Sequence, residues 1–204
     1  MAADPCRVGR RDGCRNHRPR VTDAHLAAGG VRRDPAQCCC RYRVTDLYVK
    51  NTVPGIPGLS VSSDRIGVTT MRCAALLSQL AGGVGRTVVR TGSGPVAEVY
   101  PAASLVRWGF NHKGYKGRKG KAGCSQLVDE LLSVATWLDL GKHEVDCRES
   151  DDALDAVLAS MTARAAALGM TEPIPAEAQA AAETEGWIAL PRTGTTLAEL
   201  ATSR

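Results

Sequence analysis

The stretch SDDALDAVLASMTAR, residues 150–164, predicts the helix around which the rest of the chain is organised. Ser150 is a favourable N-cap, and acids fill the first turn, where the helix dipole favours negative charge. Apolar residues then recur at helical spacing until Gly169 offers a stop: Leu154, Val157, Leu158 and Met161. The sequence therefore predicts an amphipathic helix with an acidic N-terminal end.

The acids of this helix are candidate ligands for a divalent cation. Asp152 and Asp155 are three residues apart, so they project from the same side of the helix, and Asp151 adds a third carboxylate. Carboxylate oxygens suit Mg²⁺ or Mn²⁺, whose sites commonly use one or two protein carboxylates. The alternative is that these acids only compensate the helix dipole. A metal site therefore needs a second, independent acid.

Glu98 is the candidate for that second acid. It stands at the centre of PVAEVY, residues 95–100, a run rich in strand-forming residues, where burial without a partner would be costly. A strand carboxylate that faces helix carboxylates can hold the paired ions that hydrolyse phosphodiesters. The alternative is that Glu98 points to solvent from an edge strand.

Composition indicates a soluble globular protein with one domain, with or without tails. The chain has 204 residues, of which 44% are hydrophobic and 23% charged. No run approaches the length of a membrane span and no signal-peptide core is visible, so we expect a cytoplasmic location and no membrane partner. The net charge of +5 favours a polyanionic partner only weakly, because ten arginines and four aspartates lie within residues 1–43.

Read in order, the chain predicts an α/β domain. Residues 1–40 show no sustained period and are expected to form a disordered or divergent Arg/Cys-rich tail. Strand 95–100 passes directly into a helix over 102–108, as in α/β domains. The other predicted elements are a short helix at 43–50 with Thr45 as its cap, a helix from Ser62 or Ser63 to Gly82 packed on a sheet, a brief extended piece at 87–89, a helix over 125–138, a connection over 141–148, a helix over 176–184 and a strand over 186–191.

The segment from Gly109 to Gly123 is a glycine-rich, cationic loop. Tyr115 is surrounded in it by five cations: Lys113, Lys116, Arg118, Lys119 and Lys121. Lysine charges and backbone amides can hold phosphate, so Tyr115, Lys116 and Lys119 are candidate substrate-binding residues. The alternative is a solvated, mobile loop.

A series of short motifs then brings a family resemblance into view. In chain order these are RVTD (43–46), SVSSDRIG (60–67), EVYPAA (98–103), WG (108–109), GYKG (114–117), DDALDA (151–156), TAR (162–164) and EGWIALP (185–191). Over residues 41–192 the series resembles the signature of the domain-of-unknown-function 429 family, which is described as predicted nucleases of ribonuclease-H-like fold. The resemblance implies a mixed sheet flanked by helices.

The resemblance also implies a site. Glu98, Asp152 and Asp155 would be catalytic residues that hold Mg²⁺ or Mn²⁺, with Asp151 as an auxiliary ligand. The expected function is a metal-dependent nuclease or phosphodiesterase with nucleic acid as its candidate partner. The alternative is a non-catalytic nucleic-acid- or protein-binding module, and a third hypothesis is an unfolded product of a damaged gene.

The sequence departs from the family at its start. Family members begin with a hydrophobic strand that carries a metal-binding aspartate, and residues 1–40 contain no comparable run. We therefore expect a ribonuclease-H-like domain over residues 41–192 that is incomplete at its N-terminal strands, and a C-terminal tail over 193–204. A truncated or out-of-frame gene start is one hypothesis for the tail. Loss of the first strands would remove the centre of the sheet and one metal ligand, which puts both folding and activity in doubt.

Overall fold

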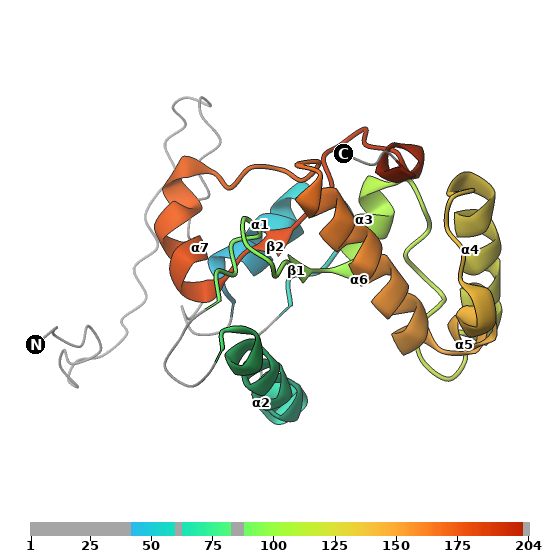
Figure 1. The fold of residues 1–204 in the computed structure, drawn as a ribbon, viewed down its shortest axis with the longest axis horizontal. Helices are drawn as coiled ribbons and strands as arrows, with labels where there is room; N and C mark the ends of the chain where they lie inside the picture. The colour runs from blue at the N-terminus through green and yellow to red at the C-terminus, as the bar shows by residue number, and fades with distance from the viewer. Residues whose placement is uncertain (1–41, 60–62, 83–87, 202–204) are drawn as a thin grey trace, which may run out of the picture. The chain divides into compact units, whose positions relative to one another are not determined.

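A computed structural model describes residues 42–59, 63–82 and 88–201, which form an α/β domain (Figure 1). The predicted tail over residues 1–40 lies outside the described residues. The described helices are α1 (Val44–Thr52), α2 (Ser63–Leu80), α3 (Pro101–Arg107), α4 (Lys121–Val134), α5 (Glu144–Glu149), α6 (Asp151–Ala167) and α7 (Gln179–Glu185), with the 3-10 turns η1 (Gly141–His143), η2 (Ala176–Ala178) and η3 (Leu197–Ala201).

Helix α6 confirms the prediction made from residues 150–164. Ser150 is its N-cap, and the Ser150 hydroxyl accepts a hydrogen bond from the backbone N–H of Ala153 at 3.4 Å. Leu154 and Leu158 are fully buried and Met161 is almost so. Burial of a leucine side chain contributes about 1.5–3 kcal/mol, so the apolar face of α6 supplies much of the stability of this domain.

The main core forms where α6 meets α4 and the chain's last described turn. Leu127, Val128 and Leu131 of α4 pack in one cluster with the buried face of α6. Leu197 and Leu200 of η3 belong to the same cluster, so the predicted C-terminal tail packs onto the domain as far as it is described, to Ala201. The indole N–H of Trp137 donates to the backbone carbonyl of Leu197 at 2.8 Å and fixes this turn.

The sheet is smaller than the sequence predicts. It consists of β1 (Glu98–Val99) and β2 (Ile188–Ala189), which run parallel with Glu98 opposite Ile188. Only two residues of each predicted strand belong to the sheet. The described residues before and after them in the chain form loops and helices. The predicted extended piece at 87–89 is also no strand where it is described. The α/β class is confirmed at this coarse level.

Several helix boundaries differ from the prediction for local reasons. Thr45 is not the cap of α1, because its hydroxyl accepts the buried backbone N–H of Ile188 at 2.9 Å, and Arg43 takes the cap position. Helix α4 begins at Lys121 instead of residue 125, and residues 141–149 form η1 and α5 where a plain connection was expected. Pro101 opens α3, as its fixed φ favours.

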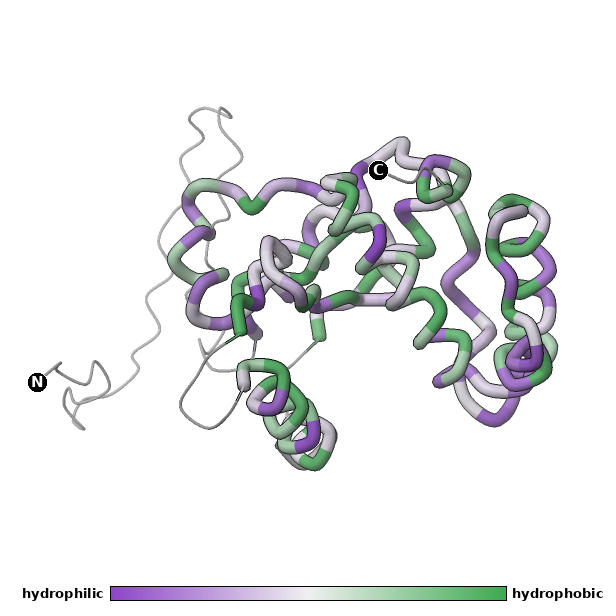
Figure 2. The backbone as a smooth tube through the Cα atoms, in the orientation of Figure 1, coloured by the Kyte–Doolittle hydropathy of each residue, from purple (hydrophilic) through white to green (hydrophobic). Residues whose placement is uncertain are grey.

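Helix α2 forms as predicted but exposes its apolar side chains. Val68, Met71, Leu76 and Leu80 are each more than half exposed, and Figure 2 shows hydrophobic residues along the helix. The predicted packing of α2 on a sheet is therefore not observed among the described residues. None of the helices in this part of the chain combines the length and the apolar content that a membrane crossing requires.

Candidate functional site

The cationic loop, residues 111–121, is anchored to the domain by a buried tyrosine. Tyr115 is only 1% exposed, and its hydroxyl donates to Oδ1 of Asp155 at 2.9 Å. The backbone carbonyl of Tyr115 accepts a hydrogen bond from the thiol of Cys124 at 3.1 Å. Burial and the neighbouring Asp155 carboxylate raise the pKa of Tyr115, so the phenol stays protonated as the donor.

Two glycines of the α4 N-terminus let the helix approach the loop closely. A Cβ at Gly120 would overlap the backbone of Tyr115 and Lys116, and one at Gly123 would overlap the backbone of Gly114. Gly114 and Gly117 have φ angles of +85° and +73°, which side chains rarely adopt. The loop backbone therefore packs closely against the start of α4. The flexibility predicted from its glycine content stays a prediction.

Lys116 sits between the predicted substrate loop and the predicted metal ligands. Its ammonium pairs with Oδ2 of Asp155, lies 4.0 Å from Oδ2 of Asp151 and stands over the Tyr115 ring at 4.9 Å from the centroid. The N–H of Gly117 donates to the same Asp151 oxygen at 3.1 Å. Asp151 and Asp155 thus bind the Lys116 ammonium, and Asp151 also binds the Gly117 amide. The predicted metal ligands and the predicted substrate-binding loop therefore contact each other.

Three of the remaining loop cations are exposed, and a fourth makes a loose ion pair. The side chains of Lys113, Arg118 and Lys119 are exposed and form no ion pair with any residue that the structure describes. Lys121 pairs only loosely with Glu149, at 3.8 Å and with both side chains about two-thirds exposed. The packed loop therefore presents three positive charges that no acid in the described part of the chain pairs with.

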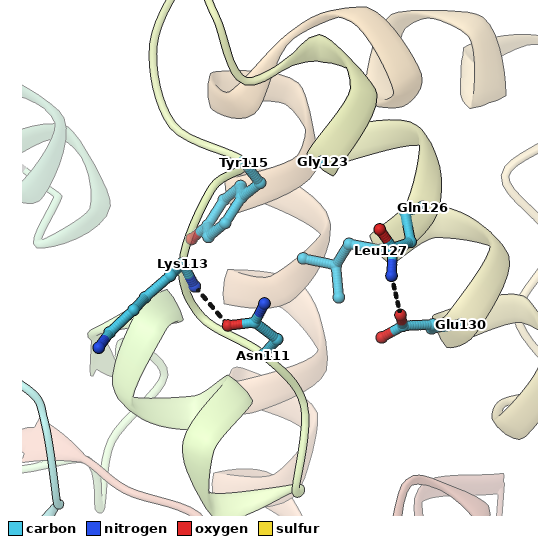
Figure 3. A pocket seen from close by; sticks show the side chains of 7 residues that line it. All are labelled: Asn111, Lys113, Tyr115, Gly123, Gln126, Leu127 and Glu130. Atoms are coloured by element: carbon cyan, nitrogen blue, oxygen red, sulfur yellow. Dashed lines mark hydrogen bonds between the residues drawn. The ribbon is translucent and has the colours of Figure 1, made fainter.

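A small pocket opens between this loop and α4 (Figure 3). Asn111, Gln126 and Glu130 supply polar groups to it, and the Asn111 carboxamide oxygen accepts the backbone N–H of Lys113 at 2.9 Å. In Figure 3 the Lys113 side chain points away from Gln126 and Glu130. The volume of about 30 Å³ holds one or two water molecules. The pocket is therefore too small to enclose a nucleobase.

Glu98 lies in a different environment from the acids of α6. Both of its carboxylate oxygens accept hydrogen bonds from the Arg43 guanidinium, at 2.6 and 2.9 Å. The loop before β1 lies beside the other end of α6, because Ala97 lines a cavity of about 280 Å³ with Ala163, Ala166 and Ala167. Eight residues of helix, about 12 Å along its axis, separate Ala163 from Asp155.

The predicted acids, as arranged here, do not form a metal centre. Asp155 and Asp151 contact Lys116, Glu98 contacts Arg43, and Asp152 is exposed with no partner in the described structure. Among residues 42–59, 63–82 and 88–201, no group of three or more His, Cys, Asp or Glu side chains could hold a metal ion. The donor set that Mg²⁺ or Mn²⁺ requires is therefore divided between two places.

Comparison with known families identifies the chain. The model of a protein family described as "Protein of unknown function (DUF429)" matches residues 42–180, which is more than half of the sequence. The chain belongs to the DUF429 family. No curated protein and no solved structure matches the chain. DUF429 membership confirms the resemblance carried by the sequence motifs, while the nuclease activity and the ribonuclease-H-like fold stay predictions.

Sequence reasoning missed the partner of Glu98. Arg43 lies in the RVTD motif, which carried the DUF429 resemblance but received no role of its own. The available signal was the strand acid itself, because a carboxylate in the middle of an apolar run requires a cation or several donors. The structure provides that cation from a residue 55 positions earlier in the chain.

Proposed function

We propose that this DUF429 domain is a nucleic-acid-binding module that holds the phosphate backbone through Lys113, Arg118 and Lys119. The observation that supports the proposal is the combination of three exposed, unpaired cations with a loop backbone fixed by Tyr115 and two close-packed glycines. A fixed loop pays little conformational entropy when its charges meet a polyanion. Lys116 has a different role in this proposal, because its charge is already used by Asp155.

The same geometry favours binding without base recognition. Sequence is read through hydrogen bonds to base edges or through stacking of unpaired bases on aromatic side chains. The one tyrosine of the loop is buried, and the adjoining pocket holds only one or two waters. We therefore expect similar affinities for strands of different sequence and a strong dependence on salt.

The test is the salt dependence of binding, measured by fluorescence anisotropy with labelled 20-nucleotide DNA, RNA and duplex in EDTA. Three phosphate contacts predict a slope of log K against log salt of about −2 for single strands and about −3 for duplex DNA. Each of Lys113→Ala, Arg118→Ala and Lys119→Ala should make the slope shallower by about 1 and weaken binding to all sequences alike.

The matched control is Lys142→Ala, which removes one exposed, unpaired lysine from η1 outside the loop. It changes the net charge by the same amount as each loop variant. Binding that falls equally in the control would mean that only the overall charge matters. A triple loop variant that binds like the wild type would contradict the proposal directly.

Metal-dependent nuclease activity on a ribonuclease-H-like fold is the second candidate. It is favoured by DUF429 membership and by Asp152, an exposed carboxylate in the same helical turn as two further acids. It requires Glu98 to leave Arg43 and approach the α6 acids with Mg²⁺ or Mn²⁺. Labelled DNA, RNA and hybrids incubated with Mn²⁺ test it. Cleavage that disappears with EDTA and in Asp152→Asn would support it, and cleavage that persists in both would exclude this acid set.

A cytoplasmic location completes the proposal. Cys73, Cys124 and Cys147 are all free thiols in the described structure, and two of them are buried in the same core cluster. Free thiols are the usual state in a reducing compartment. Fractionation of cells that express a tagged chain tests the location.

A further inference from the structure

We infer that Glu98 is a structural anchor for Arg43 and not a metal ligand. The Glu98 carboxylate, the Arg43 guanidinium and the Asp46 carboxylate form a three-membered ion cluster, called here the Arg43 clamp, which ties α1 to β1 and to the end of α7. This inference concerns a different part of the molecule from the proposed nucleic-acid contact and does not depend on it.

The Arg43 clamp uses every donor of the guanidinium. The Nε donates to Asp46 at 3.0 Å, and Nη2 donates to Asp46 at 3.2 Å and to Glu98 at 2.6 Å. The Nη1 donates to Glu98 at 2.9 Å and to the backbone carbonyl of Glu185 at 3.4 Å. All five N–H groups therefore have an acceptor. Bidentate pairing of this kind is characteristic of arginine that fixes geometry.

The surroundings of the clamp explain why a cation is needed there. The Asp46 side chain is fully buried, and an ionised carboxylate without a partner in that position would be strongly unfavourable. Although burial by itself lowers the pKa of Arg43, the hydrogen bonds and charges of Glu98 and Asp46 raise it above its ordinary value. The guanidinium thus stays charged and compensates both acids.

The clamp lies at the end of the two-stranded sheet at which Glu98 pairs with Ile188. Glu98 pairs with Ile188 across the two strands, and the N–H of Ile188 donates to Thr45 of α1 at 2.9 Å. The Glu185 carboxylate accepts the free N–H of Val44 at the start of α1, at 2.9 Å. Arg43, Thr45 and Glu185 therefore hold one end of the sheet against α1. A two-residue ladder has few bonds of its own to do so.

A divalent cation at Glu98 would compete with this arrangement. Both oxygens of Glu98 already accept charge-assisted hydrogen bonds, and Mg²⁺ would need one of them at about 2.0–2.1 Å. Displacing Arg43 would leave Asp46 buried without its counter-ion. The acids of α6 supply no further ligands for a cation at Glu98, since they contact Lys116 on another part of the domain.

The sign of the stability change in Glu98→Gln distinguishes an anchor from a ligand. In a cluster of like charges, neutralising one acid relieves repulsion and raises the melting temperature of the metal-free protein. In the Arg43 clamp the same change removes a charge-assisted pair, so we expect the melting temperature to fall by about 4–10 °C in EDTA. Asp152→Asn, which neutralises an exposed and unpaired acid, is the control and should shift it by about 2 °C or less.

A double-mutant cycle then assigns the loss to Arg43. Arg43→Lys keeps the positive charge but cannot satisfy both acids with a planar fork. Glu98→Gln should cost less than half as much in the Arg43→Lys background as in the wild type. Equal costs in the two backgrounds, or a Glu98→Gln protein more stable than the wild type, would overturn the inference. If Glu98→Gln does not fold while Asp152→Asn does, the anchor role is supported and the cycle is completed with Glu98→Asp.

Metal titration provides an independent readout. Melting temperatures of wild type and Glu98→Gln are compared with and without millimolar Mn²⁺. A ligand role predicts a metal-induced rise in the wild type that Glu98→Gln abolishes. The anchor role predicts the same response to Mn²⁺ in both proteins, and a response lost only in Glu98→Gln would overturn it.

Discussion

At the start of α6, Asp151 and Asp155 share one lysine, whereas Asp46 of α1 and Glu98 of β1 share one arginine. The lysine is about half exposed and its acids are about a quarter exposed, while Asp46 is fully buried. A surface lysine pair is weakened by solvent and salt, but a buried carboxylate depends on its counter-ion. Two acid pairs that each share one cation therefore have different consequences for stability.

Removal of Arg43 should cause the largest loss of stability. Arg43→Met leaves the buried Asp46 carboxylate without a cation, so we expect a loss of about 3–5 kcal/mol in the free energy of unfolding. Urea denaturation followed by circular dichroism measures it. Arg43→Met/Asp46→Asn, which removes both charges, should recover part of the loss. A single variant within 1 kcal/mol of the wild type would show that Asp46 does not depend on Arg43.

Tyr115→Phe tests the hydrogen bond that anchors the cationic loop to Asp155 of α6. The change keeps the buried ring and removes only the hydroxyl that donates to Asp155. Loss of a hydrogen bond to a charged acceptor should cost about 1.5–3 kcal/mol in urea denaturation. It should also increase hydrogen exchange of the Gly117 and Gly120 amides, because the loop loses its anchor. Unchanged exchange in a destabilised protein would mean that the hydroxyl supports the core and not the loop.

Tyr48 of α1 should make the stability of the protein depend on pH in the alkaline range. Burial, the hydrogen bond to Glu172 and the Glu172 charge raise the pKa of Tyr48 to about 12, from about 10 in the unfolded chain. Between these values the unfolded chain releases a proton that the folded chain keeps, so stability falls as pH rises from 10 to 12. Urea midpoints of wild type and Tyr48→Phe across that range should show a shallower decline in the variant. Parallel declines would place the titration on other groups.

Lys116→Met should have the smallest effect. The side chain is half exposed, and such pairs contribute about 0–1 kcal/mol. We expect a loss within that range, and a smaller one in 0.5 M salt, because screening already weakens the pair. A loss above 2 kcal/mol in the same urea experiment would place Lys116 in the same class as Arg43.

The sequence predicted those parts of the domain in which local pattern and packing agree. Helix α6 has its cap, its dipole-compensating acids and its apolar period within one stretch, so its existence and its start at Asp151 follow directly. The motif order also predicted DUF429 membership. Helix α5 was missed because its six residues contain two acids in the first turn and no apolar period.

The candidate site was harder to predict because partners in it come from distant positions. Spacing placed Asp152 and Asp155 on one helical face, but it could not show that Tyr115 and Lys116 contact Asp155 from 40 and 39 residues away. The close approach of Gly120 and Gly123 to the loop is likewise a tertiary feature. Glycine content alone indicated flexibility, whereas these glycines permit close packing.

The packing of η3 makes Trp137 an intrinsic fluorescence probe of the last described turn. The Trp137 indole donates to the carbonyl of Leu197, and Leu197 and Leu200 are buried beside it. Detachment of this turn would wet the indole and move its fluorescence to longer wavelength. Trp137 emission, read in a protein whose Trp108 and Trp187 are replaced by phenylalanine, therefore reports fraying of the last turn separately from global unfolding.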